Sequence, residues 1–126
     1  MLYIVPLEKY EERYTEQWSR WIPDSLRIND VKFETIQGDV LTNTIESGEV
    51  LDCFNTNFFK FSQLQKIIVK IRNGEIKEGD HIWFADLWFP GIESLFYIRN
   101  ITGIKFKISG ILHAGTWDFN DFTYRY

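Results

Sequence analysis

Two ionisable side chains stand where predicted strands end, and both could move a proton. Asp86 closes the apolar stretch 81–87, and His113 follows the stretch 104–112. A partly buried carboxylate can act as a general base, and an imidazole titrates near neutral pH. Each has a structural alternative, since Asp86 could cap the next helix and His113 could be a hydrogen-bonded residue at a strand end. The sequence predicts Asp86 and His113 as the catalytic residues.

Other polar and aromatic residues near these strand ends could bind a substrate. Side chains at the carboxyl ends of parallel strands converge on one crevice, where aromatic rings can stack on a hydroxylated ligand. A guanidinium could clamp a phosphate or carboxylate there, although an arginine on a helix surface is often only solvated. Asp118 could equally be a turn former. The predicted substrate-binding residues are Arg13, Tyr14, Trp88, Thr116, Trp117 and Asp118.

Several familiar site motifs are missing from the chain. No GxGxxG follows the first predicted strand, and neither a P-loop nor a GxSxG elbow is present. No zinc-type Cys/His spacing and no DxD pair occurs, so we expect no metal ion and no cofactor in this chain. Cys53 could form a thiol–imidazole pair with His81 or His113 only if folding brought them together.

Composition limits the class of protein. The 126 residues fit one domain, and a net charge of −4 with dispersed basic residues argues against coating of DNA. The single cysteine, Cys53, indicates a reducing compartment. Residues 1–9 do not resemble a signal peptide, and no apolar stretch is long enough to span a membrane. We expect a cytoplasmic protein that makes no membrane contact.

The predicted elements alternate in type along the chain. Short apolar runs predict strands at 2–5, 31–36, 81–87 and 104–112, and helical periodicity predicts helices at 8–21, 57–72 and 91–100. Such alternation is typical of a Rossmann-like α/β domain spanning 1–126. Its sheet is open, mostly parallel and doubly wound, with four or more strands and helices on both faces. The first strand is expected at the centre of the sheet and the second near an edge.

Helix faces and the longest loop can also be predicted. Trp18 and Trp21 are expected to pack on the sheet, in a helix that ends before Pro23. Residues 40–56 are expected to form an excursion over the binding face, with a short strand or helical turn inside it as the alternative. The helix 57–72 is expected to face the core with Phe58, Phe61, Leu64, Ile68 and Ile71, a stripe that Phe59 and Ile67 widen. Its mostly solvent-facing residues are expected to be Lys60, Gln63, Gln65, Lys66 and Lys70.

Three stretches of the chain together resemble a known family. The stretches 11–18, 84–93 (FADLWFPGIE) and 110–118 (GILHAGTWD) are similar to the N-terminal half of phage-type glycosyltransferases of the GT-B architecture. The resemblance implies two Rossmann-like domains facing a cleft, with the acceptor on the N-terminal domain and most of the nucleotide-sugar donor on the other. Asp86 or His113 would then deprotonate an acceptor hydroxyl, with Trp88 and Trp117 lining the groove.

The resemblance also sets expectations for partners. The acceptor would be a glycan, a small molecule or a modified nucleobase, in the host cytoplasm if the protein is phage-encoded. The C-terminal donor domain is absent from this chain, so the isolated chain is expected to be inactive. Two alternatives remain: a small nucleotide- or sugar-binding module, and a non-catalytic interaction domain that dimerises through exposed aromatics. Aromatic residues of all kinds make up 17% of the chain.

Overall fold

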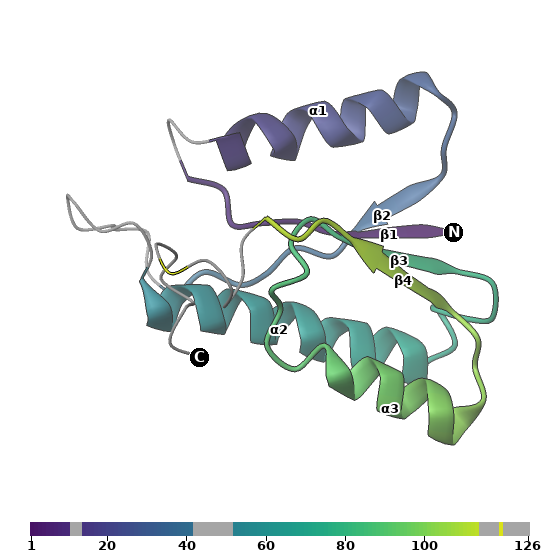
Figure 1. Cartoon of the computed structure of the whole chain (residues 1–126). Coiled ribbons are helices and arrows are strands. Elements are labelled where there is room, and N and C mark those ends of the chain that lie inside the picture. The colour runs from purple at the N-terminus through teal and green to yellow at the C-terminus, as the bar shows by residue number, and fades with distance from the viewer. Residues whose placement is uncertain (11–13, 42–51, 114–118, 120–126) are drawn as a thin grey trace.

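The fold consists of one open parallel sheet with helices on both faces. The computed structural model describes residues 1–10, 14–41, 52–113 and 119. The strands are β1 (Leu2–Val5), β2 (Phe33–Thr35), β3 (His81–Phe84) and β4 (Lys107–Gly110). They alternate with α1 (Tyr14–Ile28), α2 (Cys53–Arg72) and α3 (Glu93–Thr102), as Figure 1 shows. The predicted Rossmann-like α/β fold class is confirmed.

The strand order places the predicted site at the carboxyl ends of the two central strands, β1 and β3. The order is β2-β1-β3-β4, and every neighbouring pair is parallel. As predicted, β1 is central and β2 is an edge strand. The chain leaves β1 toward β2 on one side and later returns to β3 on the other, so the direction of winding reverses between β1 and β3. Ligands of open α/β sheets bind at such a reversal, outside the carboxyl ends of the strands.

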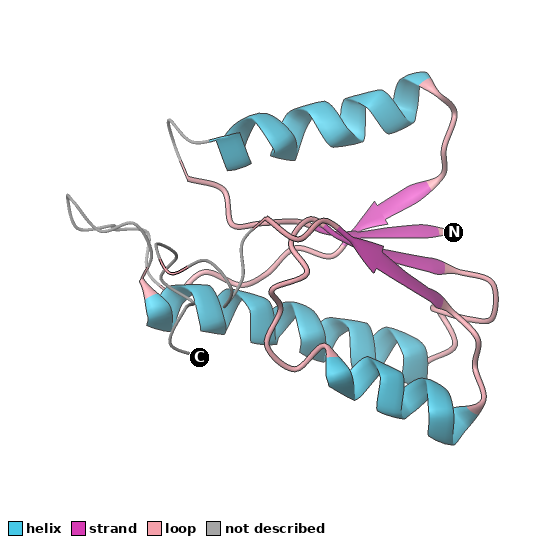
Figure 2. Ribbon diagram, viewed as in Figure 1, coloured by secondary structure: helices cyan, strands magenta, loops and turns pink. Residues whose placement is uncertain are grey.

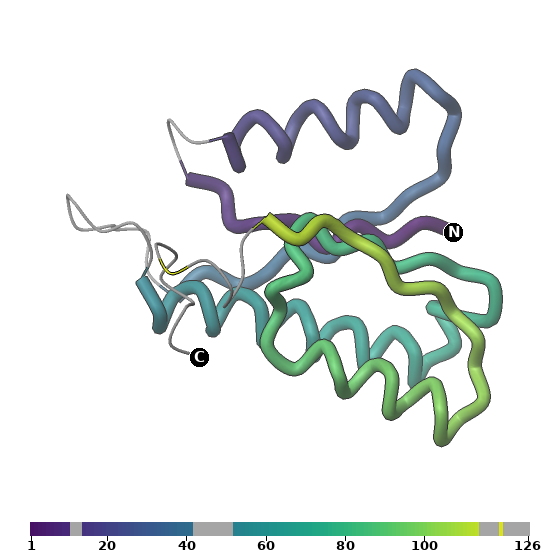
Figure 3. Tube along the Cα trace, viewed as in Figure 1, coloured from purple at the N-terminus to yellow at the C-terminus, as the bar shows by residue number. Residues whose placement is uncertain are grey.

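The helices divide unequally between the two faces of the sheet. α1 covers one face alone, while α2 and α3 lie side by side on the other (Figure 2). The helix N-termini lie at the same side of the molecule as the strand carboxyl ends (Figure 3). The carboxyl ends of the strands and the first turns of the helices therefore lie at the same side of the molecule as the predicted site.

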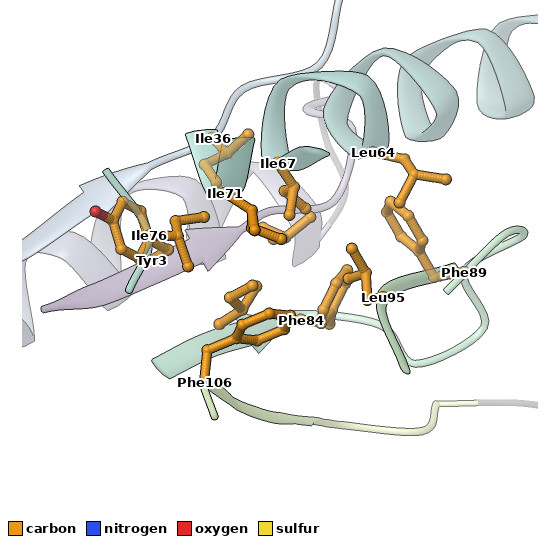
Figure 4. Packing of buried hydrophobic residues seen from close by; sticks show 12 residues of the cluster. Tyr3, Ile36, Leu64, Ile67, Ile71, Ile76, Phe84, Phe89, Leu95 and Phe106 are labelled. Atoms are coloured by element: carbon orange, nitrogen blue, oxygen red, sulfur yellow. The ribbon is translucent and has the colours of Figure 1, made fainter. Parts of the chain in front are cut away.

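The hydrophobic core lies on the α2 and α3 side of the sheet. Alternate residues of β1 and β3, such as Tyr3, Val5 and Phe84, point to this side and are buried. They meet Leu64 and Ile67 of α2 (Figure 4). Because a parallel sheet is normally covered on both faces, a core restricted to one face leaves the α1 side comparatively open.

The predicted orientation of α2 is only partly correct, since Phe59, Leu64, Ile67 and Ile71 are buried as expected. Phe58, Phe61 and Ile68, which were expected in the core, are exposed, and Lys60 and Gln63 are buried instead. Gln63 is stabilised there because its Nε2 donates to the carbonyls of Pro6, at 2.9 Å, and Ile36, at 3.0 Å. These carbonyls lie just beyond β1 and β2, so the Gln63 amide replaces hydrogen bonds that the sheet no longer supplies there.

Several predicted boundaries also move. α2 begins at Cys53 rather than residue 57, because Asp52 caps it by accepting hydrogen bonds from the Phe54 and Asn55 amides. The end of the 40–56 stretch therefore belongs to α2, and residues 42–51, on which the prediction for this stretch mainly falls, lie outside the described part. The predicted strands 31–36, 81–87 and 104–112 are each shorter, and the last helix runs from 93 to 102.

α1 differs most from its predicted span. It runs from Tyr14 to Ile28 and contains Pro23, which was expected to follow its end. Ile22 and Leu26, on either side of the proline, line a groove between the helix and the sheet. Trp21 is exposed rather than packed on the sheet, and Trp18 is half-buried. No helix in the described ranges combines the length and apolarity needed to cross a bilayer.

Two neighbouring phenylalanines test the orientation of α2. Phe59 is 2% exposed and Phe58 is 44% exposed. We expect Phe59→Ala to lower the free energy of unfolding by about 3–5 kcal/mol, because it empties a packed site. Phe58→Ala should change it by less than about 1 kcal/mol. Urea unfolding followed by circular dichroism measures both, and a larger loss for Phe58→Ala would contradict this orientation.

Candidate active site

Asp86 lies in a turn just beyond β3 rather than in the strand. Its Oδ1 accepts a hydrogen bond from the Trp88 amide at 3.0 Å, which closes an Asx-type turn. The following helix, α3, has Ile92 at its N-cap position and no side-chain cap. The alternative role of Asp86 as a helix cap is therefore wrong. The turn instead fixes the carboxylate at the carboxyl edge of the sheet.

A buried lysine from α2 binds this turn. The Lys60 Nζ donates to Asp86 Oδ2 at 3.3 Å and to the Trp88 carbonyl, and it lies 4.3 Å from the centre of the Trp88 ring. The Lys60 and Asp86 side chains are only 6% and 16% exposed. Burial lowers the pKa of Lys60, and the negative charges of Asp86 and Glu8 oppose this shift. Both oxygens of Asp86 are thus engaged within the chain.

Glu8 and Tyr10, in the segment that follows β1, also contribute charge and hydrogen bonds near Lys60. The Tyr10 hydroxyl donates to the Glu8 carboxylate, and the Tyr10 amide donates to Thr15 Oγ1 of α1 at 3.3 Å. Burial raises the pKa of Tyr10, and the adjacent Glu8 raises it further. Tyr10 is therefore a neutral hydrogen-bonding group at physiological pH. Glu8 balances part of the positive charge of Lys60.

His113 is oriented by a backbone carbonyl. Its Nε2 lies 2.7 Å from the Ala85 oxygen. A carbonyl can only accept, so Nε2 carries the proton in the neutral ring and Nδ1 carries the lone pair. The imidazole also packs on α1, with ring centres 5.0 Å from Trp18 and 5.8 Å from Tyr14. This arrangement gives His113 a fixed tautomer whose Nδ1 can accept a proton.

The predicted site residues fall into two groups. Asp86 and Trp88 join Lys60 on the α2 side of the sheet edge, while His113 and Tyr14 join Trp18 on the α1 side. The groups are linked through the backbone, because His113 binds the carbonyl of the residue before Asp86. The predicted residues Arg13, Thr116, Trp117 and Asp118 lie outside the described part of the chain.

Sequence reasoning missed the polar side of α2. Besides Lys60 and Gln63, the side chains of Asn55 and Thr56 near its N-terminus are buried. The relevant signal is their spacing: positions 56, 60 and 63 share one helix face. That face was assigned to solvent because polar residues on amphipathic helices usually point outward.

Comparison with known proteins does not add to the geometry. No protein-family model matches the chain, and no curated protein or solved structure matches it either. Within the described residues, no group of three or more His, Cys, Asp or Glu side chains is placed to hold a metal ion.

The Lys60–Asp86 pair makes a testable electrostatic prediction. In an NMR titration of lysine side-chain nitrogens, Lys60 should deprotonate at a pH below the ordinary lysine pKa, because burial disfavours its charged form. Asp86→Asn should lower the Lys60 pKa further, since it removes an opposing negative charge.

The same shift predicts how stability changes with pH. Between the lowered pKa of Lys60 in the folded chain and the ordinary lysine pKa, the unfolded state binds more protons. The wild type should therefore gain stability relative to Lys60→Met as pH rises through this window. Titration of Lys60 at or above the ordinary lysine pKa would contradict this burial of its ammonium.

Proposed function

We propose that this chain is the acceptor-side domain of a GT-B glycosyltransferase, which transfers a sugar from a nucleotide-sugar donor to an acceptor hydroxyl. The parallel sheet and the reversal point between β1 and β3 support this function, together with the resemblance of 84–93 and 110–118 to such enzymes. The observation that carries the proposal is the fixed tautomer of His113, whose Nδ1 can take a proton at the carboxyl edge of the sheet.

His113 acts as the general base. Its Nδ1 accepts the proton of the acceptor hydroxyl while the hydroxyl oxygen forms a bond to the anomeric carbon of the donor sugar. The bond between that carbon and the nucleotide phosphate oxygen breaks, and the nucleoside diphosphate leaves with the bonding electrons. The Ala85 carbonyl stabilises the imidazolium that results, because it accepts the Nε2 proton.

Asp86 acts as a positioning residue rather than as the base, because it holds the turn that orients His113. Its two oxygens bind the Trp88 amide and the Lys60 ammonium, so the carboxylate holds the segment that also carries the Ala85 carbonyl. Trp88 lies against Lys60 and forms the wall beside it. In the glycosyltransferases that the chain resembles, the second domain binds most of the donor, and we assign the same division here.

Replacement of His113 tests the proposal. His113→Ala should lower the kcat of sugar transfer by about 10²–10⁴-fold, the usual contribution of a general base. The measurement uses the product of the whole reading frame with a panel of nucleotide sugars and hydroxylated acceptors. Lys105→Ala is the control, because Lys105 is exposed and precedes β4 at the opposite edge of the sheet. Unchanged transfer by His113→Ala, or no turnover of any nucleotide sugar by the wild type, would refute the assignment.

A second candidate, a non-catalytic interaction domain, is favoured by an apolar stripe on α2. Four large side chains share this exposed face, which we call the α2 stripe: Phe54, Phe58, Phe61 and Ile68. Large apolar side chains exposed along one helix face are typical of protein interfaces.

Light scattering tests this second function. If the α2 stripe mediates self-association, the wild type should be dimeric and the double variant Phe58→Glu/Phe61→Glu monomeric, because charges at the stripe would be buried in the dimer. Ile101→Glu, at an exposed apolar position on α3, is the matched control and should not alter the mass. A strictly monomeric wild type would exclude dimerisation through this face.

A further inference from the structure

An apolar groove lies between α1 and the sheet, outside the polar site already described. Its volume is about 420 Å³, within the range of roughly 300–1,000 Å³ that is typical of small-molecule sites. On the helix side it is lined by three residues of α1: Trp18, Ile22 and Leu26. The part of α1 from Trp18 to Leu26 therefore does not pack directly on the strands.

The sheet side of the groove is equally apolar. Leu2 and Ile4 of β1 and Trp83 of β3 line it, because alternate strand residues point away from the core on the other face. Ile111, just beyond β4, extends the lining toward the carboxyl edge. The polar residue His81 also lines the groove, and its Nε2 pairs with Ser109 Oγ at 2.6 Å. A ligand in this groove would meet carbon atoms along most of its length.

The groove leads to the candidate base. Trp18 belongs to the groove and its ring centre lies 5.0 Å from that of His113. Ile111 precedes His113 by two positions. A second, smaller cavity of about 60 Å³ shares Trp18 and Trp83 with the groove and reaches Ala85, whose carbonyl orients His113. One end of the groove thus lies close to His113, which contacts the groove residue Trp18.

We propose that this groove binds the acceptor, and that the acceptor is an alcohol of small-molecule size with an apolar carbon skeleton. The skeleton lies between α1 and the sheet, and its hydroxyl lies at His113 Nδ1. This assignment rests on the proposed function for the reaction and deepens it by naming the substrate class. A glycan does not fit, because each hydroxyl placed among Leu2, Ile4 and Ile22 would lose its hydrogen bonds to water.

Octan-1-ol is a direct probe of the groove. Titrated into the 126-residue chain, it should shift the NMR signals of the Trp18 and Trp83 indoles and of the His113 ring, with saturation at one equivalent. Glucose, an alcohol without an apolar skeleton, should shift none of them. Shifts with glucose but not with octan-1-ol, or no saturable shift with octan-1-ol, would overturn the proposal.

Matched variants locate the bound alcohol. Leu26→Trp places a larger side chain in the groove and should weaken octan-1-ol binding by about tenfold or more. Ile101→Trp introduces the same residue at an exposed position on α3 and should leave binding unchanged. Circular dichroism checks that both variants are folded. Equal affinities in the two variants would place the alcohol elsewhere.

A second copy of the chain is the competing occupant. If two chains covered the groove for each other, Ile22→Cys would form an intermolecular disulfide, light scattering would give a dimeric mass, and octan-1-ol would dissociate the dimer. That result would overturn the proposal. A monomeric chain that binds octan-1-ol supports it.

Kinetic measurements of sugar transfer distinguish a failure of this proposal from a failure of the proposed function. With the product of the whole reading frame, Leu26→Trp should raise the KM for apolar alcohols and leave kcat at saturating acceptor nearly unchanged. Sugar transfer with an unaltered KM would reject the groove and keep the glycosyltransferase. Saturable octan-1-ol binding without sugar transfer to any acceptor would keep the groove and reject the glycosyltransferase.

Discussion

Burial of one face of α2 against a parallel sheet determines both the core and the candidate site. Toward the C-terminus this face supplies Leu64, Ile67 and Ile71 to the core, and toward the N-terminus it supplies Lys60 to the turn after β3. A buried ammonium without partners would be unfavourable by several kcal/mol, so the Asp86–Trp88 turn must adopt the geometry that satisfies it. The helix and the turn therefore constrain each other. The chemistry at the edge of the sheet depends on this mutual constraint.

The fold class could be predicted from the sequence because it depends on the order of strands and helices. That order stays the same even where the predicted boundaries of an element are wrong by several residues. Short apolar runs alternate with helical segments, and this alternation implies a parallel sheet. The continuous apolar run at 2–5 further predicts that β1 lies at its centre. The orientation of α2 could not be predicted in the same way. Phe58 and Phe61 make the wrong face look more apolar, while Gln63 is stable on the buried face only because two carbonyls beyond β1 and β2 accept its amide protons. Those acceptors are 57 and 27 positions away, and no local pattern reveals them.

The candidate site shows a similar division. Strand ends predicted that Asp86 and His113 would come to one edge of the sheet, and they do. The side of the sheet on which each lies is set by its partners, Lys60 from α2 and Trp18 from α1, which sequence spacing does not identify. The open groove follows from the same asymmetry. Two helices cover the α2 side and one covers the other, so apolar residues of β1 and β3 such as Ile4 and Trp83 line unfilled space.

The central position of β1 has a consequence for synthesis of the protein. Leu2 pairs with His81, and the Met1 terminus binds Asp80, which lies 79 positions away. At translation rates of about 5–20 residues per second, β1 waits roughly 4–16 seconds before this neighbour leaves the ribosome. β2 emerges sooner, but a two-stranded ribbon alone has little stability in water. During these seconds of synthesis the apolar strand β1 lacks the neighbour that covers one of its two hydrogen-bonding edges.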